Sequence, residues 1–499
     1  MKKLLKFSAV TIAIAGIIGL TGCGGGGGSG GDVSSAGSTQ TSTGIVTGFG
    51  SVYVNGVEYE TGGSTFSLDD GDDGPENEGE LGIGMVVTVT GLVNPDGVTG
   101  SASHIEYDDE LEGIVISEDI DDVTGTGTMN VMGQTVIVDE VAIFESEVPG
   151  ITSMEQIAVD QVVEVSGYPT GDGTIYATRV EVELATHAGE EIEVKGTIEN
   201  LTTTTFMLGD LTVDFSTALL DDSIPGGVFS EGLYVEVKST AGFNSLDQLI
   251  ASEAELEGDG DLDHDGDEGD EVEISGMVTS VTPPEGTPTE FEIGGKRVLL
   301  GFDTSYEHGT LDDIIVGAML EADGSLDAFG VLLAAEVEFE EESNIEMEGT
   351  LEAVSGTGAS GTITLFGQTL TVTPDTVMVD EQDEDVEPVH FFGLDDLVAI
   401  VDYIEVDTHR DPDTDDLIAD KIERDDAPDG EDALDPDELE GLVEDNSVDG
   451  QLTIAGVVVD ISGLLELPPI SVGDEVEVEG TYNVGTETFE AASIEVDEE

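Results

Sequence analysis

This chain of 499 residues has few basic side chains, no tryptophan and almost no cysteine. It contains 11 Lys and Arg against 113 Asp and Glu, a single Cys, and a formal net charge of −102. Proteins hold nucleic acids and anionic lipid headgroups mainly by neutralising phosphates with Lys and Arg. The composition therefore excludes nucleic acid as a main partner. One cysteine provides no disulfide framework, so burial must hold the folded parts together.

The N-terminus has the pattern of a targeting segment. Three lysines lie within residues 1–6, and residues 7–20 form an apolar run too short to span a bilayer. The run ends in Leu20-Thr21-Gly22-Cys23, which resembles the lipobox of bacterial lipoproteins. This resemblance implies that residues 1–22 are a signal peptide and that Cys23 is acylated, with palmitate among its chains. Because Gly24 is not the Asp that retains many lipoproteins in the inner membrane, we expect an outer-membrane lipid anchor, on the periplasmic or the cell-surface face.

A tether and a repeated module follow the anchor. Residues 23–43 are rich in Gly, Ser and Thr, without apolar periodicity, which is typical of a flexible tether. Beyond them the signature Ala-x-x-(Ile/Val/Ala)-Glu occurs six times, and each copy is preceded by an opening Gly. We expect either that contacts between neighbouring modules stabilise them or that the modules act as rigid beads. The predicted β-modules cover residues 44–107, 111–184, 192–257, 272–339, 345–424 and 438–497, with an acidic linker at 258–271.

Within each module the hydrophobic period is two, which indicates β-strands. In residues 473–480 apolar residues alternate with acidic ones, as in a sheet with one buried and one solvated face. Turn residues such as Asn55-Gly56 and Gly294-Gly295 separate two of the strands, which is typical of hairpins. About five strands in roughly 60 residues predict an all-β chain of tandem small five-stranded barrels of the oligonucleotide/oligosaccharide-binding (OB) type. Short β-sandwich modules are the alternative.

The lipobox, the Gly-rich tether and the repeated glycines and Ala-x-x-Ile-Glu strands together resemble a bacterial lipoprotein family. That family is built from tandem copies of a domain of unknown function, DUF5666. The resemblance covers about residues 44–497 and implies architecture and location. It implies no activity.

The acidic linker contains the one candidate metal site. Asp261-x-Asp263-x-Asp265-Gly266 matches the first half of a calcium-binding loop, in which alternate side chains converge on one ion. Position twelve is Val272 instead of Glu, so a looser calcium site and a solvated acidic linker both remain open. The candidate ligands are Asp259, Asp261, Asp263, Asp265, Asp267, Asp270 and Glu271.

The rest of the sequence carries no recognisable catalytic signature. The six His share no ligand or catalytic spacing, and the chain has no Gly-x-Ser-x-Gly elbow, phosphate loop or paired-cysteine motif. We therefore expect a non-enzymatic, lipid-anchored cell-envelope protein, an acidic array of modules with a structural, adhesive or binding role, with calcium as a candidate ligand that stiffens it. A binding module for a cell-surface glycan, peptide or cationic partner is the alternative, and a secreted enzyme with an unrecognised site is a third.

Overall fold

The protein is described by a computed structural model that covers residues 38–496, apart from residues 69–77, 121–124, 140–141, 171–172, 222, 258–270, 285–286, 328–330, 340–344, 381–391, 412–413, 415, 426–435, 449 and 465–466. The described residues form 36 strands and five one-turn 3-10 helices. Cys23 and the linker residues Asp259, Asp261, Asp263, Asp265, Asp267 and Asp270 lie outside the described residues. No helix in the described part of the chain is long and apolar enough to span a bilayer.

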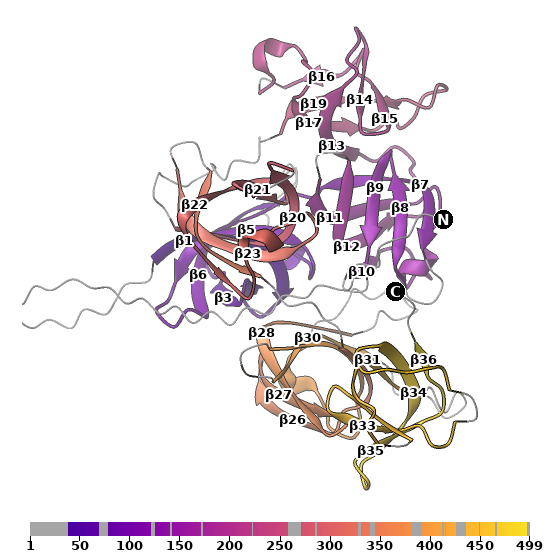
Figure 1. Cartoon of the computed structure of the whole chain (residues 1–499). Helices are drawn as coiled ribbons and strands as arrows, with labels where there is room; N and C mark the ends of the chain where they lie inside the picture. Colours follow the sequence, from indigo (N-terminus) through magenta and orange to yellow (C-terminus); the bar gives the residue numbers. More distant parts are fainter. Residues whose placement is uncertain are drawn as a thin grey trace, which may run out of the picture.

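The strands divide into six modules along the chain (Figure 1). Module 1 consists of β1 (Ser38–Gly48), β2 (Val52–Val54), β3 (Val57–Glu60), β4 (Thr65–Leu68), η1 (Glu78–Glu80), β5 (Val86–Val93) and β6 (Thr99–Tyr107). Module 2 consists of β7 (Leu111–Ile120), β8 (Gly127–Val131), β9 (Gln134–Val138), β10 (Ile143–Ser146), η2 (Met154–Gln156), β11 (Val162–Pro169) and β12 (Thr174–Leu184).

The middle of the chain forms two further modules. Module 3 consists of β13 (Ile192–Glu199), β14 (Thr205–Leu208), β15 (Leu211–Asp214), β16 (Leu219–Leu220), η3 (Pro225–Gly227), β17 (Tyr234–Ser239), β18 (Leu249–Ile250) and β19 (Glu253–Leu256). Module 4 consists of β20 (Glu271–Thr282), β21 (Glu290–Ile293), β22 (Lys296–Glu307), η4 (Leu311–Asp313), β23 (Met319–Leu326) and β24 (Leu332–Phe339).

The last two modules lie together at the bottom of Figure 1. Module 5 consists of β25 (Ile345–Thr350), β26 (Ala353–Thr357), β27 (Ser360–Leu365), β28 (Gln368–Asp380), η5 (Leu394–Asp396), β29 (Tyr403–Arg410) and β30 (Leu417–Asp425). Module 6 consists of β31 (Asp437–Asp445), β32 (Gln451–Ile454), β33 (Val457–Asp460), β34 (Glu475–Asn483), β35 (Thr488–Ala491) and β36 (Glu495–Val496).

Module 2 shows the strand connectivity most simply. β7 pairs with β8, β8 with β9, β9 in parallel with β12, β12 with β11, and β11 again with β7. This closed order, 1-2-3-5-4-1, is a small Greek-key barrel of the OB type, which confirms the predicted fold class. Modules 1, 4 and 6 close in the same way. In modules 3 and 5 one of the five strands is interrupted, as β18 and β19 or as β25 and β26.

The predicted hairpins join the second and third strands of the modules. Asn55 and Gly56 have φ angles of 48° and 69°, and Met132 and Gly133 have 46° and 88°. Two consecutive positive φ angles define a type I′ turn, whose twist matches that of the flanking strands. Glycine is favoured at the second position because it has no Cβ to clash in this region of φ.

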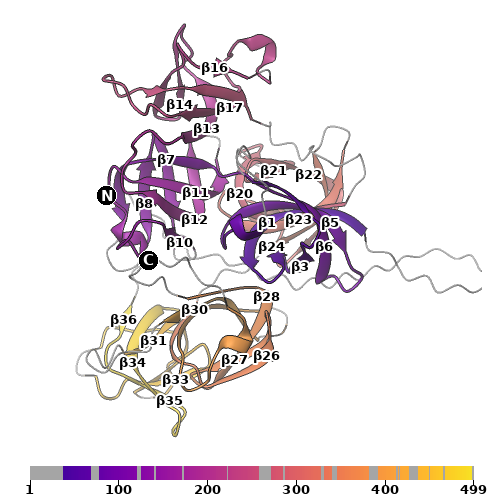
Figure 2. The same ribbon diagram turned by 180° about the vertical axis from the view of Figure 1, so that it is seen from behind.

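The modules do not stand apart, because their first strands pair with one another. β7 pairs with β13, and β25 pairs with β31, both antiparallel. β1 pairs in parallel with β20, so module 1 joins module 4 although modules 2 and 3 separate them in the sequence (Figure 2). The result is three continuous sheets, each shared by two modules. This pairing covers strand edges that would otherwise remain open to other chains.

The hydrophobic cores follow this pairing in modules 2 and 3 and in modules 5 and 6, but not in modules 1 and 4. One apolar cluster runs through modules 2 and 3, another through modules 5 and 6, and modules 1 and 4 each have their own. In β34 the buried Val476 and Val478 alternate with the half-buried Glu475 and Glu477, as the period of two predicts.

One expectation needs correction, and one pairing was not expected. β1 begins at Ser38, so residues 38–43 of the predicted tether are strand residues that pair with β5 and β20. The sequence also predicted stabilising contacts between neighbouring modules, and module 1 makes such contacts with module 2, where Tyr107 donates to Glu164 and Arg179 donates to Ile83 O. The sheet partner of module 1 is module 4, which the sequence did not predict. The reason is that edge pairing uses backbone groups, which carry no sequence signal of the partner.

Candidate functional site

Two rows of acidic side chains cross the interface between modules 5 and 6. Directly opposed residues on five adjacent strands form the first row, which contains Glu423, Glu405, Glu348, Glu438 and Glu479. The second row contains Lys421, Asp407, Glu346, Glu440, Glu477 and Glu495. Directly opposed side chains are about 5 Å apart, and like charges at this spacing repel. We call these residues the carboxylate rows.

Burial and repulsion change the ionisation of the carboxylate rows. Burial raises the pKa of Glu346 to about 10, and the negative charges of Glu405 and Asp407 add to this shift. Burial and the neighbouring carboxylates raise the pKa of Glu438 to about 7. One lysine stands within the rows, since Lys421 Nζ lies 2.7 Å from Glu423 Oε2. The rows therefore favour the binding of protons or cations.

The corresponding face of modules 2 and 3 carries its own cations. Arg179 forms ion pairs with Glu145 and, at 2.6 Å, with Glu181. Lys238 Nζ lies 3.2 Å from Glu236 Oε2 and 3.8 Å from Glu193 Oε2. All three bases at this interface, Arg179, Lys195 and Lys238, are buried. These bases pair with part of the acidic face, while Glu181, Glu164, Glu112 and Glu193 stand directly opposite one another across four strands.

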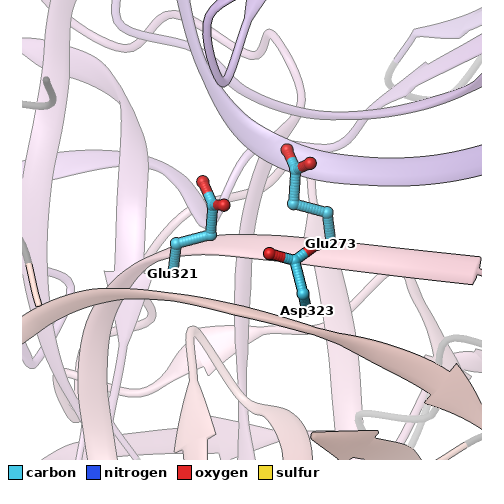
Figure 3. Close-up of side chains that lie close together, drawn as sticks. All are labelled: Glu273, Glu321 and Asp323. Carbon is cyan, nitrogen blue, oxygen red and sulfur yellow. The ribbon is translucent and has the colours of Figure 1, made fainter. Parts of the chain in front are cut away.

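Module 4 holds a third acidic group, which we call the Glu273 cluster: Glu273, Glu321 and Asp323 (Figure 3). One carboxylate oxygen of each residue lies within 4.8 Å of the others. Glu273 is on β20, and the other two are on the adjacent strand β23, with Asp323 directly opposite Glu273. Residues Glu346, Glu405 and Asp407 of module 5 form a similar group.

Module 1 covers the Glu273 cluster. Gln40 Nε2 donates a hydrogen bond of 2.7 Å to Glu273 Oε2. The pKa of Glu273 is raised to about 8, chiefly by burial and also by the charges of Asp323 and Asp375, although polar contacts from Asn55 and Gln40 act in the opposite direction. Burial also raises the pKa of Asp323. The cluster therefore lies at the interface of modules 1 and 4, in an environment that disfavours its negative charge.

Two cavities lie between modules. One of about 60 Å³ is lined mainly by apolar atoms from modules 1, 2, 4 and 5, among them Ile45, Tyr176 and Met277. The other, of about 310 Å³, lies between modules 2 and 3 and is polar, with Glu110, Lys195 and Tyr234 in its wall. Burial raises the pKa of Glu110 to about 7. The first cavity has room for about two waters, and Lys195 in the second is already engaged by Asp108.

The predicted site residues and the observed clusters differ. Of the predicted calcium ligands, Glu271 is described. It is exposed at the start of β20, opposite Gln40 and Ser325. The sequence analysis did not single out the carboxylate rows or the Glu273 cluster. The alternation Glu-x-Asp in residues 321–323 and 405–407 was the available signal, but it does not reveal which strand lies beside it.

One buried pair also escaped the sequence analysis. His409 Nδ1 lies 2.7 Å from Asp420 Oδ1, and both residues are buried between β29 and β30. The two residues lie on adjacent strands of one sheet, and no spacing motif in the sequence indicates that they form a pair.

The geometry defines the class of protein: a tandem array of OB-type β-barrels with acidic sheet faces. The family model described as Domain of unknown function (DUF5666) matches residues 42–106, 112–181, 275–338 and 348–423, just over half of the chain. The chain belongs to this family, as its repeated glycines and Ala-x-x-Ile-Glu strands predicted. The matches fall on modules 1, 2, 4 and 5, and modules 3 and 6 show the same strand order outside them. Comparison with curated proteins gives no match.

Proposed function

We propose that this chain is a non-enzymatic, lipid-anchored protein of the outer membrane whose modules form a stiff acidic scaffold for a cationic partner. The lipobox-like residues at Cys23 support the anchor. Sheet pairing between modules supports the stiffness, because a sheet that continues from one barrel into the next restricts the motion of the two barrels relative to each other. The absence of catalytic motifs from the sequence supports a role without chemistry.

The carboxylate rows carry the proposal of a cationic partner. Five acidic residues stand directly opposite one another across five strands, and the second row contains one lysine. Such an arrangement is unfavourable in isolation and becomes favourable when positive charge neutralises it. The partner that fits best is a basic peptide segment, since its amines repeat along an extended chain much as the carboxylates repeat across the strands.

Binding of an oligolysine peptide to the full chain tests this proposal. Glu348 and Glu438 are directly opposed across the interface of modules 5 and 6, so the double variant Glu348→Gln/Glu438→Gln removes two charges from the first row. We expect at least about tenfold weaker binding, which corresponds to about 1.4 kcal/mol, and a shallower dependence on salt.

A matched control removes the same charge elsewhere. Asp303 and Asp312 are exposed residues of module 4, distant in sequence from the rows. The variant Asp303→Asn/Asp312→Asn is expected to bind oligolysine within about twofold of the unaltered chain, since exposed charges contribute little each. Equal weakening by both variants, or no binding by the unaltered chain, would refute the proposed role of the rows.

A further inference from the structure

We propose that Glu273, Glu321 and Asp323 bind one calcium ion, which fastens module 1 to module 4. The site lies outside the acidic linker predicted from the sequence and is independent of the proposed scaffold function. Its three carboxylates come from two adjacent strands of one sheet, and one oxygen of each lies within 4.8 Å of the others (Figure 3). Ca²⁺ prefers six to eight oxygen ligands in a flexible arrangement, and several carboxylates suit it better than Mg²⁺.

A buried oxygen at the cluster points to the ligand. Glu273 is 9% exposed, and its Oε1 is buried without a hydrogen-bond partner among the described residues, whereas Oε2 accepts the bond from Gln40. A buried acceptor that makes no bond is costly. The Glu273 carboxylate contributes one oxygen to the cluster, so an ion bound there would supply the interaction that Oε1 lacks.

Asn55 of module 1 borders the cluster. It is 4% exposed, and its Nδ2 donates a bond of 3.1 Å to Thr43 O, which fixes the amide orientation. Its Oδ1 is buried and has no hydrogen-bond partner among the described residues. The same side chain contacts Glu273 and lowers the pKa of that carboxyl. An amide lowers the pKa of a carboxyl through its N–H side, and Asn55 Oδ1 lies against Gly44, so Asn55 holds the Glu273 carboxylate in place from module 1.

The other modules show how this position is normally neutralised. The residue pair opposed across the fourth and fifth strands contains one base in three modules: Ser166 and Arg179, Lys238 and Glu253, and Asp407 and Lys421. Module 1 has Thr90 opposite His104, and in module 6 Glu479 accepts a bond from Ser493. In module 4 both members are acidic, Asp323 and Glu336.

The charges around module 4 do not compensate for this difference. The charged groups that most affect the pKa of Glu273 are Asp323 and Asp375, both acids. Glu336 faces the negative charges of Glu307, Asp323 and Glu338. Among the ion pairs of the described residues, none includes Glu273 or Asp323. A bound divalent cation therefore takes the place that Arg179, Lys238 and Lys421 fill elsewhere.

The location explains what the ion would do. Glu273 pairs with Ser42 in the parallel ladder between β20 and β1, the strands that join modules 1 and 4. Separating the two modules would expose the ion and one of its ligands. Calcium binding is thus coupled to the association of modules 1 and 4, and the coupling follows mass action.

Amide hydrogen exchange of the full chain, in chelator and in Ca²⁺, tests the site. We expect Ca²⁺ to slow exchange in β1 and β20, by about a hundredfold when free Ca²⁺ is a hundred times its dissociation constant. The variant Glu321→Gln/Asp323→Asn keeps the side-chain shapes and removes the repulsion, so it is expected to fold and to exchange more slowly than the unaltered chain in chelator. It should show no response to Ca²⁺ in β1 and β20.

The control makes the same two changes in module 5. Glu405→Gln/Asp407→Asn alters the corresponding positions beside Lys421, and β1 and β20 of this variant should still respond to Ca²⁺. The proposal is overturned if Ca²⁺ leaves exchange in β1 and β20 of the unaltered chain unchanged. It is equally overturned if Glu321→Gln/Asp323→Asn retains the response.

Discussion

Glu336 lies directly opposite Asp323 between β24 and β23, at the place where Lys421 lies opposite Asp407 in module 5. One barrel therefore neutralises its sheet face with a lysine, and an otherwise equivalent barrel repeats the negative charge. Because the two pairs occupy the same place in the same fold, a substitution in one module can be compared directly with the natural residue in the other.

Transferring the lysine to module 4 is expected to replace the cation. The variant Glu336→Lys should raise the free energy of unfolding in chelator by about 1–2 kcal/mol, since it converts a repulsion into a charge-assisted contact. The further increase in the free energy of unfolding that Ca²⁺ produces should be smaller in this variant than in the unaltered chain. Urea denaturation measures both quantities. Asp312→Lys makes the same charge change at an exposed site of module 4 and should leave the Ca²⁺ response intact.

The carboxylate rows should make stability fall as pH rises. Glu346 has a folded-state pKa of about 10, and Glu438 one of about 7, because of burial and of the acids Glu405, Asp407, Glu440 and Glu477 that face them. The unfolded chain releases these protons near pH 4.5, so the folded state binds more protons between pH 4.5 and 10. The free energy of unfolding therefore decreases across this range.

Urea denaturation between pH 6 and 9 checks the sign of this dependence. The variant Glu346→Gln has no carboxyl proton to release at this position. We therefore expect its free energy of unfolding to decline less steeply with pH. The exposed Glu199 offers a control, because Glu199→Gln should leave the slope unchanged. A slope that does not change in Glu346→Gln would contradict the assigned ionisation.

Arg179 should be far more important for stability than Arg410. The Arg179 side chain is 4% exposed, pairs with Glu145 and Glu181, and donates a bond of 3.1 Å to Ile83 O in module 1. Arg179→Gln leaves two carboxylates uncompensated and should cost about 3–5 kcal/mol. Arg410 is 31% exposed and pairs with Glu444 at 2.9 Å, so Arg410→Gln should cost about 0–1 kcal/mol. Equal urea denaturation midpoints for Arg179→Gln and Arg410→Gln would contradict this prediction.

Gly133 should not tolerate a side chain, because it lies at the contact between modules 2 and 3. A Cβ there would lie 2.6 Å from the backbone nitrogen of Leu211 in module 3, and φ is 88°. Gly97 has a similar φ of 77° but nothing within 4 Å. Gly97→Ala should cost about 1–2 kcal/mol for the backbone conformation. Gly133→Ala should cost clearly more, and limited proteolysis should show modules 2 and 3 loosened.

The sequence predicted local structure well and long-range pairing poorly. The type I′ turn at Asn55 and Gly56 and the alternation around Val476 and Val478 could be read directly, because turn chemistry and the period of two act within a few residues. The partner of β1 could not be predicted from the sequence, because the ladder between β1 and β20 is made of backbone hydrogen bonds that almost any side chain permits. The Glu273 cluster depends on that ladder and was missed with it.

By itself the sequence determined that the chain is a series of small β-barrels with one acidic and one apolar side to each strand, and where each barrel turns. These properties follow from local spacing. Only the tertiary structure decided which barrels share a sheet, and therefore which of the 113 acidic residues are brought together and buried. A carboxylate acquires a perturbed pKa, or a need for a cation, from the groups packed against it. For Glu273 those groups come from β23 of its own module, from module 1 and, with Asp375, from module 5.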